Sequence, residues 1–158
     1  MNFQIHALSP EPFNHYFSMA QEELDAHKAV KMQVTENPGT PCRVSMADAE
    51  VGDTVILLNY DHQPNATPYQ SNHAIFVREN VAQARLAVNE VPPVLSTRLI
   101  SMRLFDENHM MIDAEVLDGQ DLQEALSKAF NNPAVAYGHL HNAKPGCFAA
   151  HVTRSSNA

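Results

Sequence analysis

Alternation of apolar and polar residues is the most frequent pattern in the chain, and it predicts strands. Val30, Met32 and Val34 alternate with polar residues, which indicates a strand with one buried face. Residues 54–60 are mostly apolar and predict a strand that is buried on both faces. Further strands are expected at residues 3–8, 42–44, 73–78, 99–105 and 110–116, and in both halves of 134–154.

Helical spacing of apolar residues is rarer and is clearest in residues 122–130. Asp121 is placed to cap this helix, and Pro133 follows its end. Its apolar residues fall on one side of the predicted helix: Leu122, Ala125, Leu126, Ala129 and Phe130. Shorter helices are expected within residues 10–29, 46–49, 80–89 and 94–97, and a long polar loop is expected at 61–72.

Strands that outnumber short helices predict an α+β protein with a mostly antiparallel sheet and a few short helices. The amphipathic helix at 122–130 precedes a C-terminal β-hairpin within 134–154. A chain of 158 residues fits a single domain, so residues 1–158 are expected to share one fold.

Charge and cysteine content narrow the class of protein. The formal net charge is −8, so we expect an acidic surface that does not bind nucleic acid. No segment approaches the roughly 18 apolar residues of a membrane span, and the first residues lack a secretory signal pattern. These features predict a soluble cytoplasmic protein with reduced thiols. A disulfide between Cys42 and Cys147 stays open, because the sequence does not give their separation.

The C-terminal hairpin holds the best candidates for a functional site. His139 and His141 are two residues apart on a predicted strand, so their imidazoles share one face about 7 Å apart along it. Two such imidazoles can chelate a divalent metal such as zinc if further ligands converge on it. His62, His151, Cys147 and Asp61 are the candidates for those ligands. The alternative is a polar sheet face without a metal.

The register of the hairpin decides which side chains lie together. A two-residue Pro–Gly turn pairs Lys144 with Cys147 and puts His141 on the face of Phe148. A three-residue loop pairs Ala143 with Cys147 and leaves Phe148 on the opposite face. We favour the second register because it separates polar from apolar residues. Its polar face would carry His139, His141, Cys147 and His151.

Cys147 is the candidate nucleophile, with His139 and His141 as the catalytic groups beside it, because a thiol near histidine can be held as thiolate. The alternative for this cysteine is a small buried apolar side chain. The planar fork of an arginine can bind a carboxylate or phosphate, although a structural salt bridge is the simpler role. The expected ligand-binding residues are Arg43, Tyr60, His62 and Asn142.

Three segments together resemble domain-of-unknown-function family 1203, a group of bacterial proteins. They are Cys42-Arg43-Val44-Ser45, Ile75-Phe76-Val77-Arg78 and Asn142-Ala143 with Gly146-Cys147-Phe148. The resemblance covers nearly the whole chain and implies a single bacterial domain. It implies no activity. The family pattern has Gly-Pro before Ile-Phe, where this chain has His73-Ala74.

Three functions are consistent with these residues. The first is small-molecule binding, with or without catalysis, in a His/Cys pocket near the last hairpin, where Arg43 fixes an anionic group. The second is metal binding through His139 and His141 with His62 or His151. The third is a non-catalytic interaction module whose acidic surface binds a basic partner.

Overall fold

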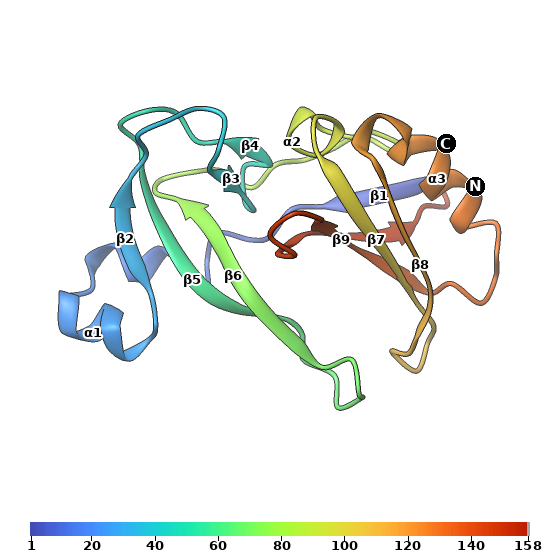
Figure 1. Cartoon of the computed structure of the whole chain (residues 1–158), viewed down its shortest axis with the longest axis horizontal. Helices are drawn as coiled ribbons and strands as arrows, with labels where there is room; N and C mark the ends of the chain where they lie inside the picture. The colour runs from blue at the N-terminus through green and yellow to red at the C-terminus, as the bar shows by residue number, and fades with distance from the viewer. Residues whose placement is uncertain (158) are drawn as a thin grey trace.

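The computed structural model describes residues 1–157, which form two five-stranded β-sheets side by side (Figure 1). In the first sheet all neighbouring strands are antiparallel, in the order β1 (Phe3–His6), β10 (Phe148–Arg154), β9 (Tyr137–Asn142), β7 (Leu99–Phe105) and β8 (Met111–Asp118). The second sheet has the order β2 (Val30–Gln33), β5 (Thr54–Gln63), β6 (Ser71–Arg78), β3 (Pro41–Cys42) and β4 (Ala47–Asp48). Only β3 and β6 pair in parallel there.

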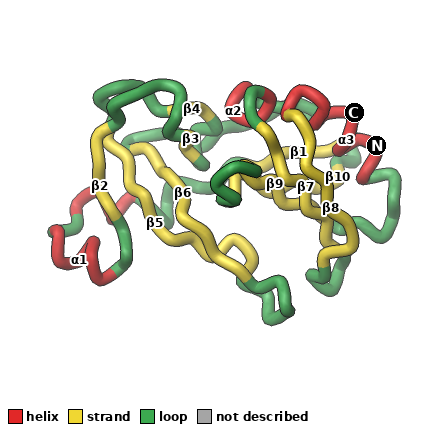
Figure 2. Tube along the Cα trace, viewed as in Figure 1, coloured by secondary structure: helices red, strands yellow, loops and turns green. Residues whose placement is uncertain are grey.

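The helices are short and lie at the margins of the sheets (Figure 2). They are the 3₁₀ helices η1 (Asn14–Ser18) and η2 (Gly119–Asp121) and the α-helices α1 (Gln21–Ala26), α2 (Pro93–Ser96) and α3 (Leu122–Ala129). Among residues 1–157, no helix has the length and apolar character needed to cross a membrane. The predicted α+β class with mostly antiparallel pairing and a C-terminal hairpin is confirmed.

The core of the first sheet forms where α3 packs against it. Leu122, Leu126 and Phe130 are fully buried, as the amphipathic pattern predicts, and they pack in one cluster with Leu140 of β9 and Val152 of β10. Burial of each such side chain stabilises the fold by about 1.5–3 kcal/mol. This packing holds one face of β9 and β10 rigidly, and their other face carries the histidines.

Two predicted helices are wrong. Residues 46–49 instead contain β4, preceded by Met46 with a left-handed backbone (φ 53°). Residues 80–89 contain no helix and run as an irregular segment. The amide of Ala84 in this segment donates to the carbonyl of Val44 (2.8 Å), so the backbone of the segment bonds to another part of the chain instead of forming helical bonds within itself.

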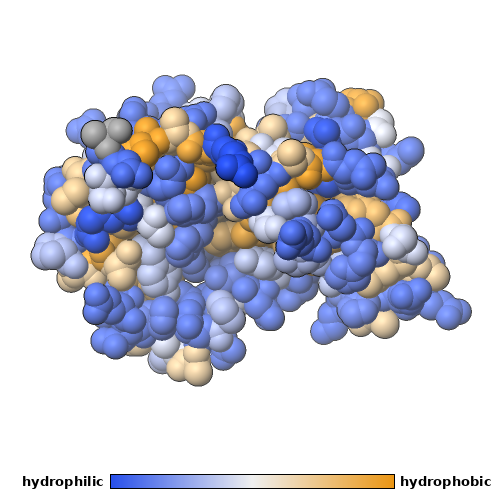
Figure 3. All heavy atoms as spheres, turned by 180° about the vertical axis from the view of Figure 1, so that it is seen from behind, coloured by the Kyte–Doolittle hydropathy of each residue, from blue (hydrophilic) through white to orange (hydrophobic). Residues whose placement is uncertain are grey.

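Two strand predictions also need correction. The predicted loop at 61–72 is shorter, because β5 extends to Gln63 and β6 begins at Ser71. β2 forms as predicted, but its apolar face is only partly buried: Val30 is 50% and Met32 40% exposed, whereas Val34, just beyond the strand, is buried. β2 is the outermost strand of its sheet. The surface seen from behind is otherwise mostly hydrophilic, with small apolar patches (Figure 3).

Candidate functional site

The C-terminal hairpin has a register that neither sequence alternative describes completely. Its loop comprises residues 143–146, closed by bonds from the Gly146 amide to the Asn142 carbonyl (2.8 Å) and from the Asn142 amide to the Cys147 carbonyl (2.9 Å). Gly146 has a φ of 80°, which favours glycine. Beyond a β-bulge after Phe148, the strands follow the favoured register, with His151 opposite His139.

The bulge corrects the predicted grouping of side chains. Phe148 pairs with His141 and shares its face, whereas it was expected on the other face. Cys147 lies opposite Asn142, so its side chain leaves the sheet on the face away from His139 and His141. The bulge adds one unpaired residue to β10. Residues before the bulge therefore point to the opposite face from the one that the favoured register predicts. The histidines and the thiol therefore do not line one pocket.

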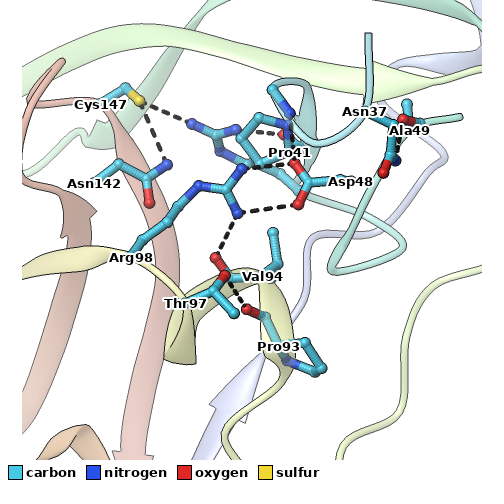
Figure 4. A network of polar contacts seen from close by, with 12 residues as sticks. Asn37, Pro41, Asp48, Ala49, Pro93, Val94, Thr97, Arg98, Asn142 and Cys147 are labelled. Carbon is cyan, nitrogen blue, oxygen red and sulfur yellow. Dashed lines mark hydrogen bonds and ion pairs between the residues drawn. The ribbon is translucent and has the colours of Figure 1, made fainter. Parts of the chain in front are cut away.

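Cys147 instead borders a cavity of about 520 Å³ between the two sheets, which we call the Arg43–Cys147 pocket. Its apolar lining comes from both sheets and the hairpin loop: Pro41, Ala74, Phe76, Leu99, Ala143 and Pro145. Its polar lining consists of Arg43, Thr97, Arg98, Asn142, Lys144 and Cys147. Figure 4 shows Cys147 beside Asn142, with the Arg98–Asp48 ion pair nearby.

Arg43 is the central charge of the pocket and is only 2% exposed. Its Nε donates to the Phe148 carbonyl (2.7 Å), Nη1 donates to the Pro41 carbonyl, and Nη2 donates to the Cys147 Sγ (3.0 Å). Among residues 1–157 no carboxylate is within ion-pair distance of it. Burial lowers the pKa of Arg43, and the neighbouring Cys147 sulfur opposes this effect. Burying a guanidinium without an anionic partner costs free energy, so a bound anion would stabilise this site.

Arg98 is held differently, by a two-pronged ion pair with Asp48. Its Nη2 and Nη1 lie 2.6 and 3.2 Å from the two carboxylate oxygens, and Nη1 also donates to the Val94 carbonyl (2.7 Å), as Figure 4 shows. This pair joins α2 to β4 and neutralises one charge at the edge of the pocket. Lys144 is exposed and adds a second positive charge beside Arg43.

Sequence reasoning found Arg43, Asn142 and Cys147 but missed Arg98 and Lys144. Lys144 lies in the loop of the hairpin that holds the other candidates, so its place in the sequence could have indicated a role in the site. No local pattern marks Arg98, because it reaches the pocket only through the contact between α2 and β4.

The two cysteines are both free. Cys42 is buried, and its sulfur accepts from the amides of Ser45 (3.4 Å) and Arg78 (3.3 Å). Cys147 is only partly buried and faces the pocket. Cys42 and Cys147 therefore do not form a disulfide, and Cys147 is the more accessible of the two thiols.

A second group of side chains, the three-histidine cluster, lies on the opposite face of β9. It comprises His62 from β5 with His139 and His141 from β9, and one ring nitrogen of each lies within 4.8 Å of the others. All three are buried. The ring of His62 stacks on Phe148, with centroids 5.2 Å apart and planes 6° apart. The cluster thus joins the two sheets.

The imidazoles of this cluster are in the form that binds metals. Burial is the main cause that lowers the pKa of His62 to about 4 and of His139 and His141 to about 3, so all are neutral at pH 7. His141 Nδ1 lies 2.9 Å from the Gly146 carbonyl. Since a carbonyl only accepts, Nδ1 carries the proton and Nε2 keeps a lone pair. The Nδ1 atoms of His62 and His139 are buried without a hydrogen-bond partner.

The remaining predicted site residues lie outside both groups. Tyr60 packs its ring on Phe13 and Phe148 and does not line the pocket. The ring of His151 meets that of His139 edge to face, with centroids 5.3 Å apart, but does not join the three close ring nitrogens. Of the candidates for a third ligand, the structure brings His62 to the pair.

Comparison with known proteins places the chain in a family without revealing a reaction. No curated protein matches the sequence, and no solved structure matches the fold. The family described as protein of unknown function (DUF1203) matches residues 39–154, which include Arg43, Cys147 and all three clustered histidines. The chain belongs to the DUF1203 family.

Proposed function

We propose that the protein binds a small anionic molecule in the Arg43–Cys147 pocket. The observation that carries this proposal is the buried guanidinium of Arg43, whose protein partners are two carbonyls and one sulfur. Three of its five N–H donors make these bonds, so two remain for a ligand. A carboxylate or phosphate group would supply the negative charge that the site lacks.

The shape and lining of the pocket support a small organic anion. Its volume of about 520 Å³ is within the usual range for small-molecule sites, roughly 300–1,000 Å³. Mostly apolar walls with a few convergent polar groups are typical of such sites. Phe76 and Leu99 would contact the apolar part of the ligand, while Arg43 and Lys144 would attract its charged group.

Any reaction in this pocket would use Cys147 without a histidine partner. His139 and His141 lie on the other face of the hairpin, so they do not act on its sulfur as bases. Arg43 takes their place as the neighbouring group, because its Nη2 donates to the sulfur at 3.0 Å. The ligand would therefore contact the thiol and the guanidinium together.

Competing alkylating reagents test this proposal. Iodoacetate is an anion and iodoacetamide is its neutral analogue, so the ratio of their rates at Cys147 measures the attraction of the pocket for negative charge. Relative to free cysteine, we expect the ratio to shift about tenfold towards iodoacetate and to fall at high salt. Cys42 is buried and serves as the internal control.

Two variants distinguish an effect of the positive charge in the pocket from an effect of unfolding. Lys144→Met changes an exposed side chain and should lower the iodoacetate rate at Cys147 without unfolding the protein, and Arg43→Met should lower it further. Inorganic phosphate should slow both reagents in the unmodified chain. A rate ratio equal to that of free cysteine, unchanged by salt and by Lys144→Met, would refute anion binding here.

A second function, divalent metal binding, is favoured by the three-histidine cluster. Three neutral imidazoles with converging nitrogens match the protein ligands of open zinc sites, which keep a fourth position for water or substrate. The bond from His141 Nδ1 to the Gly146 carbonyl is the kind of outer contact that orients a metal ligand. Zinc or cobalt(II) fits this nitrogen donor set.

Metal content tests the second function. Protein purified without chelator should contain close to one zinc per chain, and chelated protein should bind one cobalt(II) with the strong visible absorption of a tetrahedral site. His139→Ala should abolish binding, whereas His27→Ala, which changes an exposed histidine, should not. Less than a tenth of an equivalent of either metal in the unmodified chain would exclude a metal site.

A further inference from the structure

We propose that the metal site binds a small oxyanion between the metal and the guanidinium of Arg103. This inference rests on the metal function proposed above and names the ligand of the open fourth position. The ligand class is a carboxylate or phosphate group that bridges a divalent cation and an arginine.

The β7–β9 register places Arg103 beside the three-histidine cluster. Arg103 of β7 is the direct partner of His139, and Ser101 is the partner of His141. Directly paired residues point to the same face of a sheet, with Cβ atoms about 4.5–5.5 Å apart. The Nε of Arg103 donates to Ser101 Oγ (3.2 Å), which lays the guanidinium along the row of His139 and His141.

Within residues 1–157 the terminal nitrogens of Arg103 have no hydrogen-bond partner. The only side-chain hydrogen bond of Arg103 there is the one from Nε, and its side chain forms no ion pair. Its charge acts on all three imidazoles, where it helps to lower the pKa of His62, His139 and His141 after the larger effect of burial. The guanidinium is thus close to the cluster and free to bind.

Charge balance explains why an anion belongs between these groups. A divalent metal on three neutral imidazoles keeps its full charge, and Arg103 adds another positive charge on the same side. Asp61, next to His62, is the acid that acts on the cluster, and it is exposed. An oxyanion would coordinate the metal through one oxygen and accept N–H bonds from Arg103 through another.

Arg103 is the more exposed neighbour of this position, so we expect a ligand to approach from its side. The three imidazoles are buried, at 9% exposure or less, whereas Arg103 is only partly buried. A small anion that approaches the fourth ligand position from this side would meet the guanidinium first. The Arg43–Cys147 pocket is on the opposite face of the hairpin, so the two anion sites are separate.

Cobalt(II) spectroscopy tests the inference, because the visible spectrum reports only on the metal. Acetate added to the cobalt protein should change the spectrum in a saturable way, while acetamide, its neutral analogue, should not. Arg103→Met should keep cobalt bound but weaken acetate binding about tenfold or more. Arg85→Met, which changes an exposed arginine, should leave acetate binding unchanged.

The outcomes distinguish this inference from the function on which it rests. Failure of the chain to bind cobalt would refute both. Cobalt binding with no spectral response to acetate would refute the bridging oxyanion and leave the metal site standing. Equal acetate affinity in Arg103→Met and in the unmodified chain would show that Arg103 does not hold the anion, and would also refute the inference.

Discussion

Acidification of the metal-free protein provides the sharpest test of the buried histidines. Burial lowers the pKa of His139 and His141 to about 3, whereas an imidazole in an unfolded chain has a pKa of about 6.5. Between these values the unfolded chain binds protons that the folded chain does not. The free energy of unfolding is therefore unaffected by these residues above pH 6.5 and falls as the pH decreases from 6.5 towards 3.

The size of the effect follows from the separation of the two pKa values. At pH 5 an unfolded imidazole is almost fully protonated, which favours unfolding by about 2 kcal/mol per residue, or about 4 kcal/mol for His139 and His141 together. Domains of this kind have free energies of unfolding of about 5–15 kcal/mol. His62 and His151, whose pKa values are lowered to about 4, act in the same direction.

Urea unfolding followed by circular dichroism, in EDTA at pH 7 and pH 5, measures this loss. The double variant His139→Gln with His141→Gln should lose about 4 kcal/mol less than the unmodified chain between the two pH values. The difference between pH values removes the cost of the substitutions themselves. His27→Gln is the matched control on an exposed histidine. Equal losses in the double variant and the unmodified chain would refute the argument.

Four substitutions, one of them a control, test how the fold holds the pocket. In Gly119→Ala the new Cβ would overlap the Leu95 carbonyl oxygen and lie 2.7 Å from the Arg98 carbonyl oxygen, so thermal melts should show a loss of at least about 2–3 kcal/mol. Gly52→Ala, with a positive φ but open space, should lose about 1 kcal/mol; equal losses would contradict the steric explanation. Asp48→Asn breaks a partly buried ion pair and should cost about 1–2 kcal/mol in urea, with no change expected if solvent already screens the pair. Gly146→Ala forces a residue into φ 80° and should slow iodoacetate labelling of the thiol; an unchanged rate would show that the loop does not position it.

The sequence predicted the elements whose patterns are local. The helix at 122–130 is confirmed because its apolar stripe is buried as the spacing requires. The exposure of Val30 and Met32 was not predictable, since their alternation is the same on an edge strand as on a covered one. Residues 80–89 form no helix because their backbone bonds to distant carbonyls.

The candidate site was predicted only in part, for a related reason. The hairpin, Arg43, Asn142 and the two close histidines were identified from residue type and spacing. One inserted residue after Phe148 then decided which face each side chain takes, and no turn rule marks that bulge. The approach of His62 from β5 depends on how the two sheets meet, which no single segment encodes.

The shared hairpin means that the two proposed sites are not independent experimental targets. His141 and Asn142 are neighbours on one strand, yet the first belongs to the three-histidine cluster and the second lines the Arg43–Cys147 pocket. The Gly146 carbonyl orients the His141 ring, and the next residue is Cys147. Bulky modification of the thiol would shift that peptide and rotate the imidazole. Cobalt absorption should therefore register alkylation on the far side of the sheet.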